Sequence, residues 1–301
     1  MNDIIIIGAG TAGLSAAIYA RRAGKKALIL EALSYGGQII NTPEVENYPG
    51  IKNISGFDFA TGLYEQAADL GAEIEYVRVT GIESNADGSK TVHTTDGDRE
   101  CKAVIIATGA KNRPLGIERE EELTGSGVSY CATCDGAFYK KKSVAVNGGG
   151  NTAIEDAGFL SNFCSKVYVI HRRDEFRADV HEVEKLKAKE NVEFILDSEV
   201  TALLGDDELT GIEVTNKKTG EKKELEISGL FIAIGQMPDN TAFASVVDLD
   251  EKGYIIGKED CLTNTPGVFT AGDCRTKAVR QLTTAAADGA VAALAAAAYC
   301  G

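Results

Sequence analysis

The chain has 301 residues, which exceeds a typical single domain and predicts two domains. Its formal net charge of −14 at pH 7 argues against nucleic acid or an anionic membrane surface as the main binding partner. The first apolar run, residues 4–7, is too short for a secretory signal and has neither a basic start nor a cleavage site, so the expected location is cytoplasmic.

The first predicted elements form a β-α-β unit with a dinucleotide-binding fingerprint. An apolar strand at residues 4–7 leads into G-A-G-T-A-G, a helical pattern covers residues 14–23, and a second strand covers residues 27–30. Gly8, Gly10 and Gly13 allow a tight turn, close approach of a pyrophosphate to backbone N–H groups, and close helix–strand packing. Glu31 stands where a carboxylate can bind a ribose 2′-hydroxyl, so this unit predicts a dinucleotide without a 2′-phosphate.

A Cys-x-x-Cys pair lies in the middle of the chain, where residues 129–139 read S-Y-C-A-T-C-D-G-A-F-Y. Cys131 and Cys134 are two of seven cysteines, and no second pair stands at zinc-ligand spacing. The three histidines form no ligand pattern either. The pair therefore predicts redox chemistry, no metal site is expected, and the isolated cysteines are predicted to be small buried hydrophobic residues.

A second β-α-β unit follows the cysteine pair. Its strand is predicted at residues 143–147, Gly148, Gly150 and Ala153 take the place of the three glycines, and its helix is predicted through residue 163. Another strand is predicted at residues 166–170, and matching apolar segments at 103–109 and 229–235 close the two units. Asn147 departs from the pattern, because an apolar residue usually precedes the glycines. Two such units in one chain predict two dinucleotide sites.

The two predicted sites differ where the ribose would bind. Residues 171–177 read H-R-R-D-E-F-R, at the position that corresponds to Glu31 of the first unit. Arg172, Arg173 and Arg177 attract a 2′-phosphate that a carboxylate would repel. The second site is therefore predicted to prefer NADPH over NADH.

The C-terminal segment is predicted to return to the first domain. Residues 265–274 read T-P-G-V-F-T-A-G-D-C, a strand that ends in A-G-D far from the first fingerprint. Asp273 could bind a polyol chain such as the ribityl group of FAD, although A-G-D could equally be a turn. The alanine-rich segment 285–299 is interrupted by Asp288 and Gly289, and we expect a buried helix that is too short to span a bilayer.

Together these motifs resemble the bacterial-type, low-molecular-weight thioredoxin reductases over essentially the whole chain. The matching stretches are G-A-G-T-A-G, G-G-Q-I at 36–39, E-N-Y-P-G at 46–50, A-T-G-A at 107–110, C-A-T-C-D-G, G-G-G-N-T-A at 148–153, H-R-R-D-E-F-R-A, and A-G-D-C with R-Q-L at 280–282. The resemblance implies an α/β fold of two Rossmann-like, three-layer domains. An FAD-binding domain would comprise residues 1–114 and 245–301, and an NADPH-binding domain, residues 115–244, would be inserted into it and carry the cysteine pair.

The resemblance also implies the residues that bind each cofactor. FAD would be held by Gly8, Gly10, Gly13, Glu31, Gly37, Gln38, Asn47, Gly109, Gly272, Asp273, Arg280 and Gln281. NADPH would be held by Gly148, Gly150, Asn151, Thr152, His171, Arg172, Arg173, Arg177 and Gly235. Two of these positions have other interpretations, because Asn47 begins a sequence that also suits a turn and Gln38 could be a polar surface residue.

The expected reaction is the transfer of electrons from NADPH through FAD to the Cys131–Cys134 disulfide, and from the dithiol to thioredoxin. By resemblance Cys134 faces the flavin, Cys131 attacks the partner, and Asp135 is the general acid/base, although Asp-Gly is also a common turn dipeptide. The nicotinamide and the thiols both belong to the inserted domain, and both must reach the same flavin. The resemblance therefore implies that this domain rotates about its two linkers. It also implies a homodimer.

Several alternatives share parts of this pattern. Peroxide-reducing relatives carry an additional N-terminal thioredoxin-like region, whereas this chain opens with the first strand. Ferredoxin–NADP reductases lack the thiol pair, and a branch that takes electrons from ferredoxin should lack the arginines. A different thioredoxin-like or peroxiredoxin partner, or a redox sensor that holds FAD without turnover, stays open.

Overall fold

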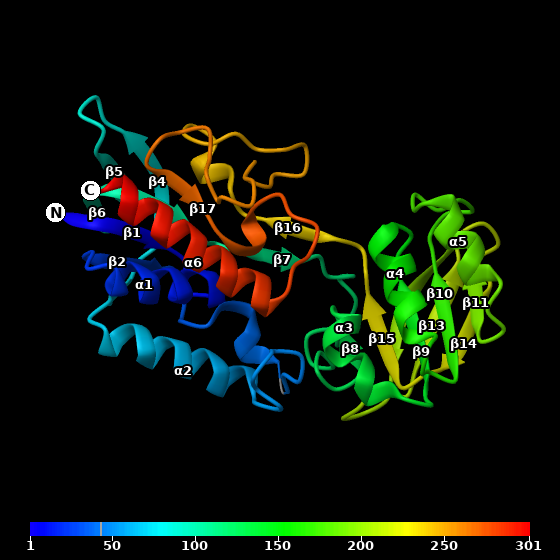
Figure 1. The fold of residues 1–301 in the computed structure, drawn as a ribbon. Coiled ribbons are helices and arrows are strands. Elements are labelled where there is room, and N and C mark those ends of the chain that lie inside the picture. The colour runs from blue at the N-terminus through cyan, green and yellow to red at the C-terminus, as the bar shows by residue number, and fades with distance from the viewer. Residues whose placement is uncertain (43) are drawn as a thin grey trace. The chain divides into compact units, whose positions relative to one another are not determined.

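The computed structural model describes residues 1–42 and 44–301 (Figure 1). The chain divides into two compact units: unit 1 comprises Met1–Lys111 and Met237–Gly301, and unit 2 comprises Asn112–Gln236. Unit 2 is thus inserted into unit 1 by two crossings of the chain. Strands β7 (Ala110–Asn112) and β16 (Gln236–Pro238) make these crossings and pair with each other in a two-stranded sheet.

Unit 1 is built on a sheet in the order β3-β2-β1-β6-β5-β4, and β17 also pairs with β6. The pairings among β1, β2, β3, β6 and β17 are parallel, whereas β4 and β5 are antiparallel to their neighbours. The bounds are β1 (Asn2–Ile7), β2 (Ala27–Glu31), β3 (Glu73–Tyr76), β4 (Val79–Ser84), β5 (Lys90–Thr94), β6 (Gly97–Ile106) and β17 (Val268–Thr270). The strand order changes direction between β1 and β6, and ligands bind beyond the carboxyl ends of strands at such a point.

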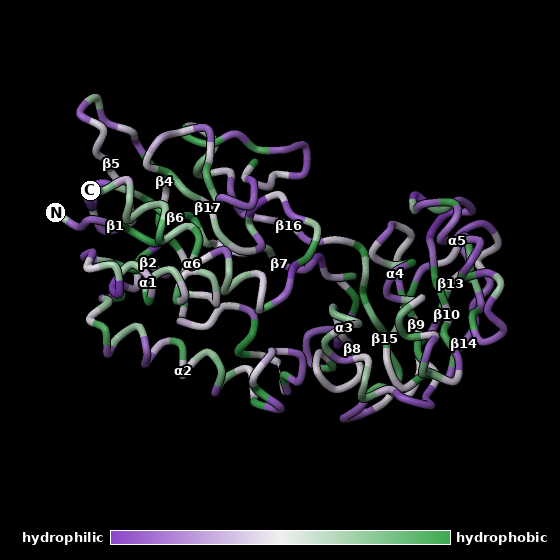
Figure 2. Tube along the Cα trace, viewed as in Figure 1, coloured by the Kyte–Doolittle hydropathy of each residue, from purple (hydrophilic) through white to green (hydrophobic). Residues whose placement is uncertain are grey.

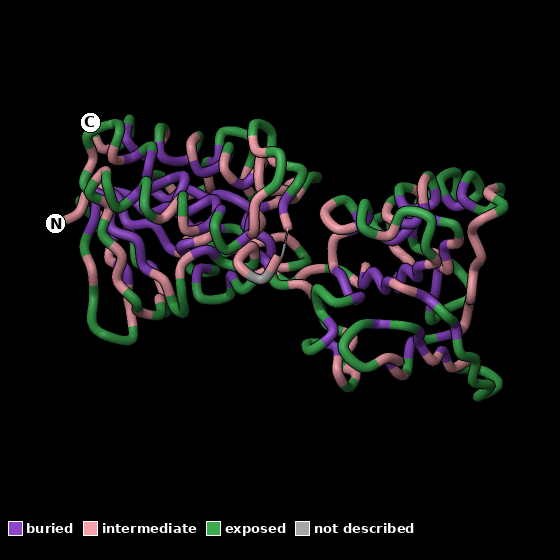
Figure 3. Tube along the Cα trace, turned by 90° about the horizontal axis from the view of Figure 1, so that it is seen from below, coloured by how far each residue is buried: buried purple, intermediate pink, exposed green. Residues whose placement is uncertain are grey.

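Helices cover one face of the unit 1 sheet. Ile4 and Ile6 of β1 pack with the helices, while Ile5 and Ile7 point to the opposite face, as the two-residue period of a strand requires. Hydrophobic residues gather on these central strands, which lie buried inside the unit (Figures 2 and 3). The helices are α1 (Thr11–Arg22), α2 (Gly56–Asp69) and α6 (Leu282–Tyr299), with short 3-10 turns η1 (Gly37–Asn41), η3 (Thr241–Phe243) and η4 (Gly272–Cys274).

Unit 2 repeats this plan with a fully parallel sheet in the order β11-β10-β9-β15-β8. Helices cover one face, and the antiparallel sheet β12-β13-β14 covers the other. The strands are β8 (Val128–Ser129), β9 (Ser143–Asn147), β10 (Lys166–Ile170), β11 (Val192–Ile195), β12 (Ser198–Leu204), β13 (Gly211–Asn216), β14 (Lys222–Glu226) and β15 (Gly229–Ile232). The helices are α3 (Ala132–Asp135), η2 (Gly136–Tyr139), α4 (Asn151–Leu160) and α5 (Val180–Lys187).

The predicted fold class, two Rossmann-like three-layer units, is confirmed by these sheets. One predicted helix end is wrong: α4 stops at Leu160, not at residue 163, because Asn162 and Phe163 donate to carbonyls three residues back and tighten the chain into a turn. The chain divides at 111/112 and 236/237, and the domain bounds implied by the resemblance lie a few residues further along, at 114/115 and 244/245. Asn240 donates from its side chain to the carbonyls of Gly253 and Cys274, which holds this stretch in unit 1. Which cofactor each unit binds stays a prediction.

Helix α6 is longer than predicted. It begins at Leu282, because Gln281 and Thr284 form a capping box there, and its 18 residues make it the one helix of the described chain long and apolar enough to cross a membrane. A core helix of a soluble protein passes the same test, and α6 packs against α1 along one face and carries the buried Asp288. The expectation of a buried helix holds for that face only, since Val291 and Leu294 are exposed.

Gly289 sets the close approach of α6 to α1. A Cβ at this position would lie 2.2 Å from the carbonyl oxygen of Ala12. We therefore expect Gly289→Ala to lower the free energy of unfolding by about 1–3 kcal/mol, because the two helices must move apart. Urea titration followed by circular dichroism measures this.

A matched control is Gly62→Ala in α2, where no atom lies within 4 Å of the added Cβ. This variant should be more stable by about 0.5–1 kcal/mol, because alanine favours the helix. Equal midpoints for the Gly289→Ala protein and its parent would contradict the packing argument.

Candidate functional site

Two of the three glycines in the turn after β1 are required by the packing of the chain, and the third, Gly10, is not. A Cβ at Gly8 would lie 2.5 Å from the carbonyl oxygen of Ala107, and one at Gly13 would lie 1.9 Å from the carbonyl oxygen of Gly8. Gly10 has no neighbour closer than 3.9 Å and has a φ of −78°, which any residue adopts. Glycine at position 10 therefore leaves the helix N-terminus open to a ligand rather than serving the packing of the chain.

Glu31 is held beside this turn at the end of β2. Its Oε2 accepts the backbone N–H of Ala9 at 2.8 Å, and its Oε1 accepts that of Leu33 at 2.9 Å. These two bonds fix the carboxylate at the carboxyl edge of the sheet, next to the N-terminus of α1. The position suits the predicted contact with a ribose 2′-hydroxyl.

Asp273 lies in the turn η4, which the C-terminal segment brings to the same unit. Its Oδ1 is buried and has no hydrogen-bond partner among the described residues. Burial raises the pKa of Asp273. A buried acceptor without a donor is a rare arrangement that a bound ligand can complete. The ribityl hydroxyls of FAD are donors of the required kind, so Asp273 fits this cofactor.

Asp288 of α6 holds the Asp273 turn in place. Its Oδ2 accepts the backbone N–H of Gly272 at 2.9 Å, and its two oxygens accept two guanidinium nitrogens of Arg275, each at 2.8 Å. Lys277 Nζ lies 2.9 Å away. Burial alone would raise the pKa of Asp288, but the hydrogen bonds from Arg275 and Lys277 lower it below its usual value. This role was not predicted from the sequence, although a lone aspartate in an alanine-rich helix could have indicated it.

The loop after β2 joins the same turn. A Cβ at Gly37 would lie 3.2 Å from Gly10 Cα, so this loop crosses directly over the fingerprint. Gln38 Nε2 donates to the carbonyl oxygen of Ala110. Gly109 has a φ of +69° with no atom near the missing Cβ. The predicted FAD residues Gly37, Gln38 and Gly109 therefore lie on segments adjoining the fingerprint or its closing strand.

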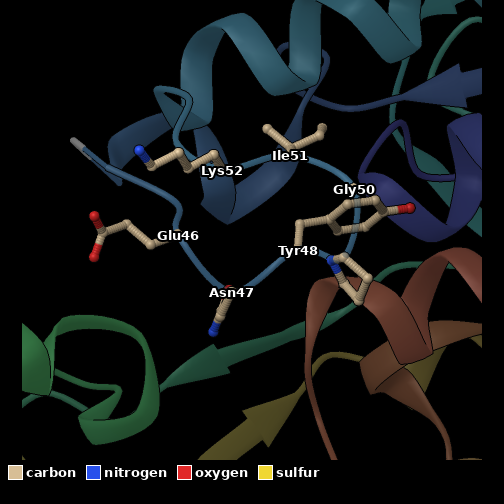
Figure 4. Close-up of a pocket in the computed structure, with 7 residues that line it drawn as sticks. Glu46, Asn47, Tyr48, Gly50, Ile51 and Lys52 are labelled. Carbon is tan, nitrogen blue, oxygen red and sulfur yellow. The ribbon is translucent and has the colours of Figure 1, made fainter.

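Asn47 and Gln281 meet although 234 residues separate them, because Asn47 Nδ2 donates to Gln281 Oε1 at 3.2 Å. Asn47 belongs to the loop 46–52, which lines an open pocket of about 500 Å³ (Figure 4). The guanidinium of the neighbouring Arg280 lies 4.3 Å from the centre of the Tyr254 ring. The structure thus places these three predicted FAD residues in unit 1.

The glycine turn of unit 2 repeats the division seen in unit 1. A Cβ at Gly148 would lie 2.3 Å from the carbonyl oxygen of Ala233, whereas Gly150 has no atom within 4 Å. Gly150 caps α4, whose first residues, Asn151 and Thr152, are exposed. Asn147 is buried at the end of β9. A second helix N-terminus is therefore open to a ligand.

The residues after β10 fall into two groups. Arg172, Arg173 and Arg177 are exposed, as a phosphate-binding cluster requires. His171 is buried: its ring stacks on Phe176 with centroids 5.2 Å apart and lies so close to Gly149 that no Cβ would fit there. Burial lowers the pKa of His171. The arginines are thus available to a ligand, and the histidine ring supports the glycine turn.

The last predicted NADPH residue, Gly235, lies just after β15. Its φ is +101°, and no atom lies within 4 Å of an added Cβ. Because few side chains adopt this φ, glycine is favoured by the backbone itself, and the space beside it is free for a ligand.

Cys131 and Cys134 form a disulfide at the start of α3. The backbone N–H groups of Cys134 and Asp135 both donate to the carbonyl oxygen of Cys131, at 3.2 and 3.1 Å. Both cysteines are partly exposed, so the disulfide is accessible to a partner. The remaining cysteines are unpaired within the described chain, and four of the five are buried.

Among the described residues, Ser129 is the one side chain that donates a hydrogen bond to Asp135. Ser129 Oγ donates to Asp135 Oδ2 at 2.6 Å and accepts the backbone N–H of Cys131 at 3.1 Å. Burial raises the pKa of Asp135, and the bond from Ser129 opposes that shift. Asp135 was predicted from the sequence, whereas the contact from Ser129 was not. In residues 1–42 and 44–301, no group of three or more His, Cys, Asp or Glu side chains could hold a metal.

Comparison with known proteins places this site in context. The pyridine nucleotide-disulphide oxidoreductase family matches residues 2–289. A protein of Clostridium pasteurianum named "34.2 kDa protein in rubredoxin operon" is 44% identical over 99% of this chain and 97% of its own length. A thioredoxin reductase of Listeria innocua is 42% identical over 96% of this chain and 91% of its own length.

A solved structure is similar to this chain over nearly its whole length as well. The thioredoxin reductase of Streptococcus pyogenes superposes with a TM-score of 0.94 at 42% identity, covering 99% of this chain and 98% of that one. Thioredoxin reductases of the pyridine nucleotide-disulphide oxidoreductase family use FAD and NADPH, which are the cofactors predicted from the sequence.

The open glycines give a direct test of the cofactor sites. We expect Gly10→Ala to fold normally but to bind FAD at least about tenfold more weakly, a loss of about 1.4 kcal/mol, because the added Cβ has room in the protein and none beside a pyrophosphate. Flavin absorbance during dialysis against free FAD measures the affinity.

The matched variant is Gly150→Ala in unit 2. It should keep its flavin and require at least about tenfold more NADPH to bleach that flavin anaerobically. If Gly10→Ala retains FAD as tightly as its parent, Gly10 does not face the cofactor.

Proposed function

The chain belongs to the pyridine nucleotide-disulphide oxidoreductase family, and on this basis we propose that it is a thioredoxin-disulfide reductase. Electrons pass from NADPH through FAD and the Cys131–Cys134 disulfide to oxidised thioredoxin. The observation that carries the proposal is the accessible disulfide beside a buried carboxyl group, in the same unit as an arginine-flanked dinucleotide turn. Relatives about 42% identical over nearly the whole chain carry the name thioredoxin reductase.

Each unit is assigned one cofactor by its charges. Glu31 in unit 1 suits an unphosphorylated ribose, and Asp273 Oδ1, which has no hydrogen-bond partner in the described part of the chain, suits a ribityl hydroxyl, so unit 1 binds FAD. The exposed arginines after β10 suit a 2′-phosphate, so unit 2 binds NADPH. When bound, FAD supplies the two-electron relay between the nicotinamide and the disulfide.

The residues of α3 carry the exchange with the partner protein. Reduction of the disulfide takes two electrons and two protons and yields two thiols. Cys131 gives its proton to Asp135 and, as the thiolate, attacks one sulfur of the partner disulfide, and the sulfur that departs takes this proton from Asp135. Cys134 then gives its proton to Asp135 and attacks Cys131 Sγ as the thiolate. The second partner sulfur departs, takes that proton from Asp135, and the Cys131–Cys134 bond is restored.

We propose that unit 2 rotates between the two half-reactions. The nicotinamide site and the thiols both belong to unit 2, and the flavin site belongs to unit 1. Only two strands, β7 and β16, connect the units, and a paired double crossing of this kind supports a hinge.

We also propose a homodimer in the cytoplasm. The exposed face of α6 carries Val291, Leu294 and Tyr299, an apolar surface that a second copy of the chain would cover. The unpaired cysteines suit a reducing compartment. Sedimentation analysis tests the oligomeric state, and a monomer at micromolar concentration would reject the dimer.

The function is tested by following NADPH oxidation with and without oxidised thioredoxin. We expect turnover only when thioredoxin is present, and loss of turnover in Cys131→Ser and Cys134→Ser, while NADPH still bleaches the flavin of both variants. Cys164→Ala, which removes an unpaired thiol of the same unit, should retain activity. Turnover that persists in Cys131→Ser overturns the mechanism, and equal rates with and without thioredoxin reject thioredoxin as the substrate.

The nucleotide preference is tested by replacing Arg172, Arg173 and Arg177 together with alanine. We expect kcat/KM for NADPH to fall by at least about 10- to 100-fold, since even a single charge-assisted bond to phosphate contributes about 1.5–3 kcal/mol. The value for NADH should not change. Lys187→Ala, which removes a positive charge that pairs with Glu184 elsewhere on unit 2, serves as the control. An equal loss with both nucleotides would mean that the arginines do not read the 2′-phosphate.

A further inference from the structure

We infer that Ser129 is the positioning residue that keeps Asp135 aimed at the cysteine pair and able to change its protonation state during thiol exchange. The inference deepens the proposed function and rests on it. The inference is based on one hydroxyl group, that of Ser129, which hydrogen-bonds both the carboxyl group of Asp135 and the backbone N–H of Cys131. Figure 1 shows β8, which carries Ser129, beside α3.

Ser129 is built into the rigid part of unit 2. It is the last residue of β8, where it pairs with Phe231 of the parallel strand β15, and its side chain is only 4% exposed. Because Ser129 is paired into a five-stranded sheet, its backbone cannot move together with the loop that follows it. Its hydroxyl therefore offers Asp135 a hydrogen-bond partner whose position is held by the pairing of β8 with β15.

The geometry of the hydroxyl assigns a direction to each hydrogen bond. The N–H of Cys131 can only donate, so the oxygen of Ser129 accepts it, and the one proton of the hydroxyl points to Asp135 Oδ2 at 2.6 Å. The alternative acceptor for that proton, the carbonyl oxygen of Cys131, lies farther away at 3.4 Å. A donor aimed at a carboxylate favours the charged form of that carboxylate.

Two opposing effects thus act on Asp135. Burial favours the neutral acid and raises its pKa, while the bond from Ser129 favours the ionised form. An acid/base group must exist in both forms near the working pH. Without Ser129, Asp135 would hold its proton to a higher pH and regenerate its charged form less readily.

Other titratable groups near Asp135 belong to the elements and loops that surround α3. Tyr139 on η2 interacts with Asp135, but burial raises the pKa of Tyr139 to about 12, so it stays neutral. Tyr130 lies next to Cys131, and burial also raises its pKa. Helix α4 packs against α3 and carries Glu155 and Asp156, and burial raises the pKa of Asp156 to about 7. Glu208 interacts with Tyr139. Asp156 is the group that a pH profile must separate from Asp135.

The test measures the titration of Asp135 directly. Aspartate carboxyl carbons are labelled with ¹³C, and the resonance of Asp135 is assigned by its loss in Asp135→Asn. We expect Ser129→Ala to move the titration midpoint of Asp135 upward by about one to two pH units, because it removes one hydrogen bond to a charged group. This measurement needs no partner protein, so it stands even if thioredoxin is not the substrate.

Two further variants separate the hydroxyl from the size of the side chain. Ser129→Thr and Ser129→Val are nearly equal in volume and differ in the hydroxyl, so Thr should keep the parent midpoint and Val should show the upward shift. Ser161→Ala removes another buried serine hydroxyl of unit 2, which bonds Gly158 and Lys189, and should leave the midpoint unchanged. An unshifted midpoint in both Ser129→Ala and Ser129→Val overturns the inference.

A kinetic arm links the shift to the exchange chemistry. The rate at which the reduced enzyme cleaves a small aromatic disulfide is followed against pH. In the plot of rate against pH, Ser129→Ala should move the limb that Asp135 controls to higher pH by the same amount. Adding Ser129→Ala to Asp135→Asn should leave the pH profile of Asp135→Asn unchanged. Asp156→Asn should leave this limb in place. If Ser129→Ala acts equally in both backgrounds, Ser129 supports only the backbone of Cys131.

Discussion

Both units depend on one constraint, a turn from strand to helix so tight that its first glycine cannot carry a side chain. At Gly8 and Gly148 the missing Cβ would lie within 2.5 Å of a carbonyl oxygen on the neighbouring closing segment. This contact brings the N-termini of α1 and α4 to the carboxyl edges of their sheets, where backbone N–H groups and the helix dipole favour phosphate. This turn holds the helix and the closing segment close together. Because of this close packing, the positions around the turn are occupied by Glu31, the arginine cluster and the closing strands.

The sequence predicted most of what depends on local pattern. The strand–turn–helix of each unit, the apolar strands and the glycine spacing are readable because each follows from the conformation of a few adjacent residues. The return of the C-terminal segment to the first unit was predicted from the A-G-D segment far from the first fingerprint, and the insertion of the second unit was implied by the family resemblance. The ends of α4 and α6 were predicted less well, since a turn of weak bonds after Leu160 and a capping box at Gln281 decide them.

The roles of Asp288 and Ser129 could not be read from the sequence. Asp288 contacts Gly272 and Arg275 across a loop, and the hydroxyl of Ser129 points to Asp135 only because β8 is anchored to β15. Such contacts arise from tertiary packing, which residue spacing does not encode. Likewise, Asp273 was named as a flavin ligand, but its unpaired buried oxygen is a property of the folded turn alone.

The insertion has a consequence for synthesis on the ribosome. Unit 2 is one continuous stretch, Asn112–Gln236, whereas the first unit needs β17, the Asp273 turn and α6 from the last part of the chain. Domains fold as units while the chain emerges. Unit 2 can therefore fold while unit 1 is still incomplete, so Cys131 and Cys134 lie in a folded unit before the last strand and helix of unit 1 have been made.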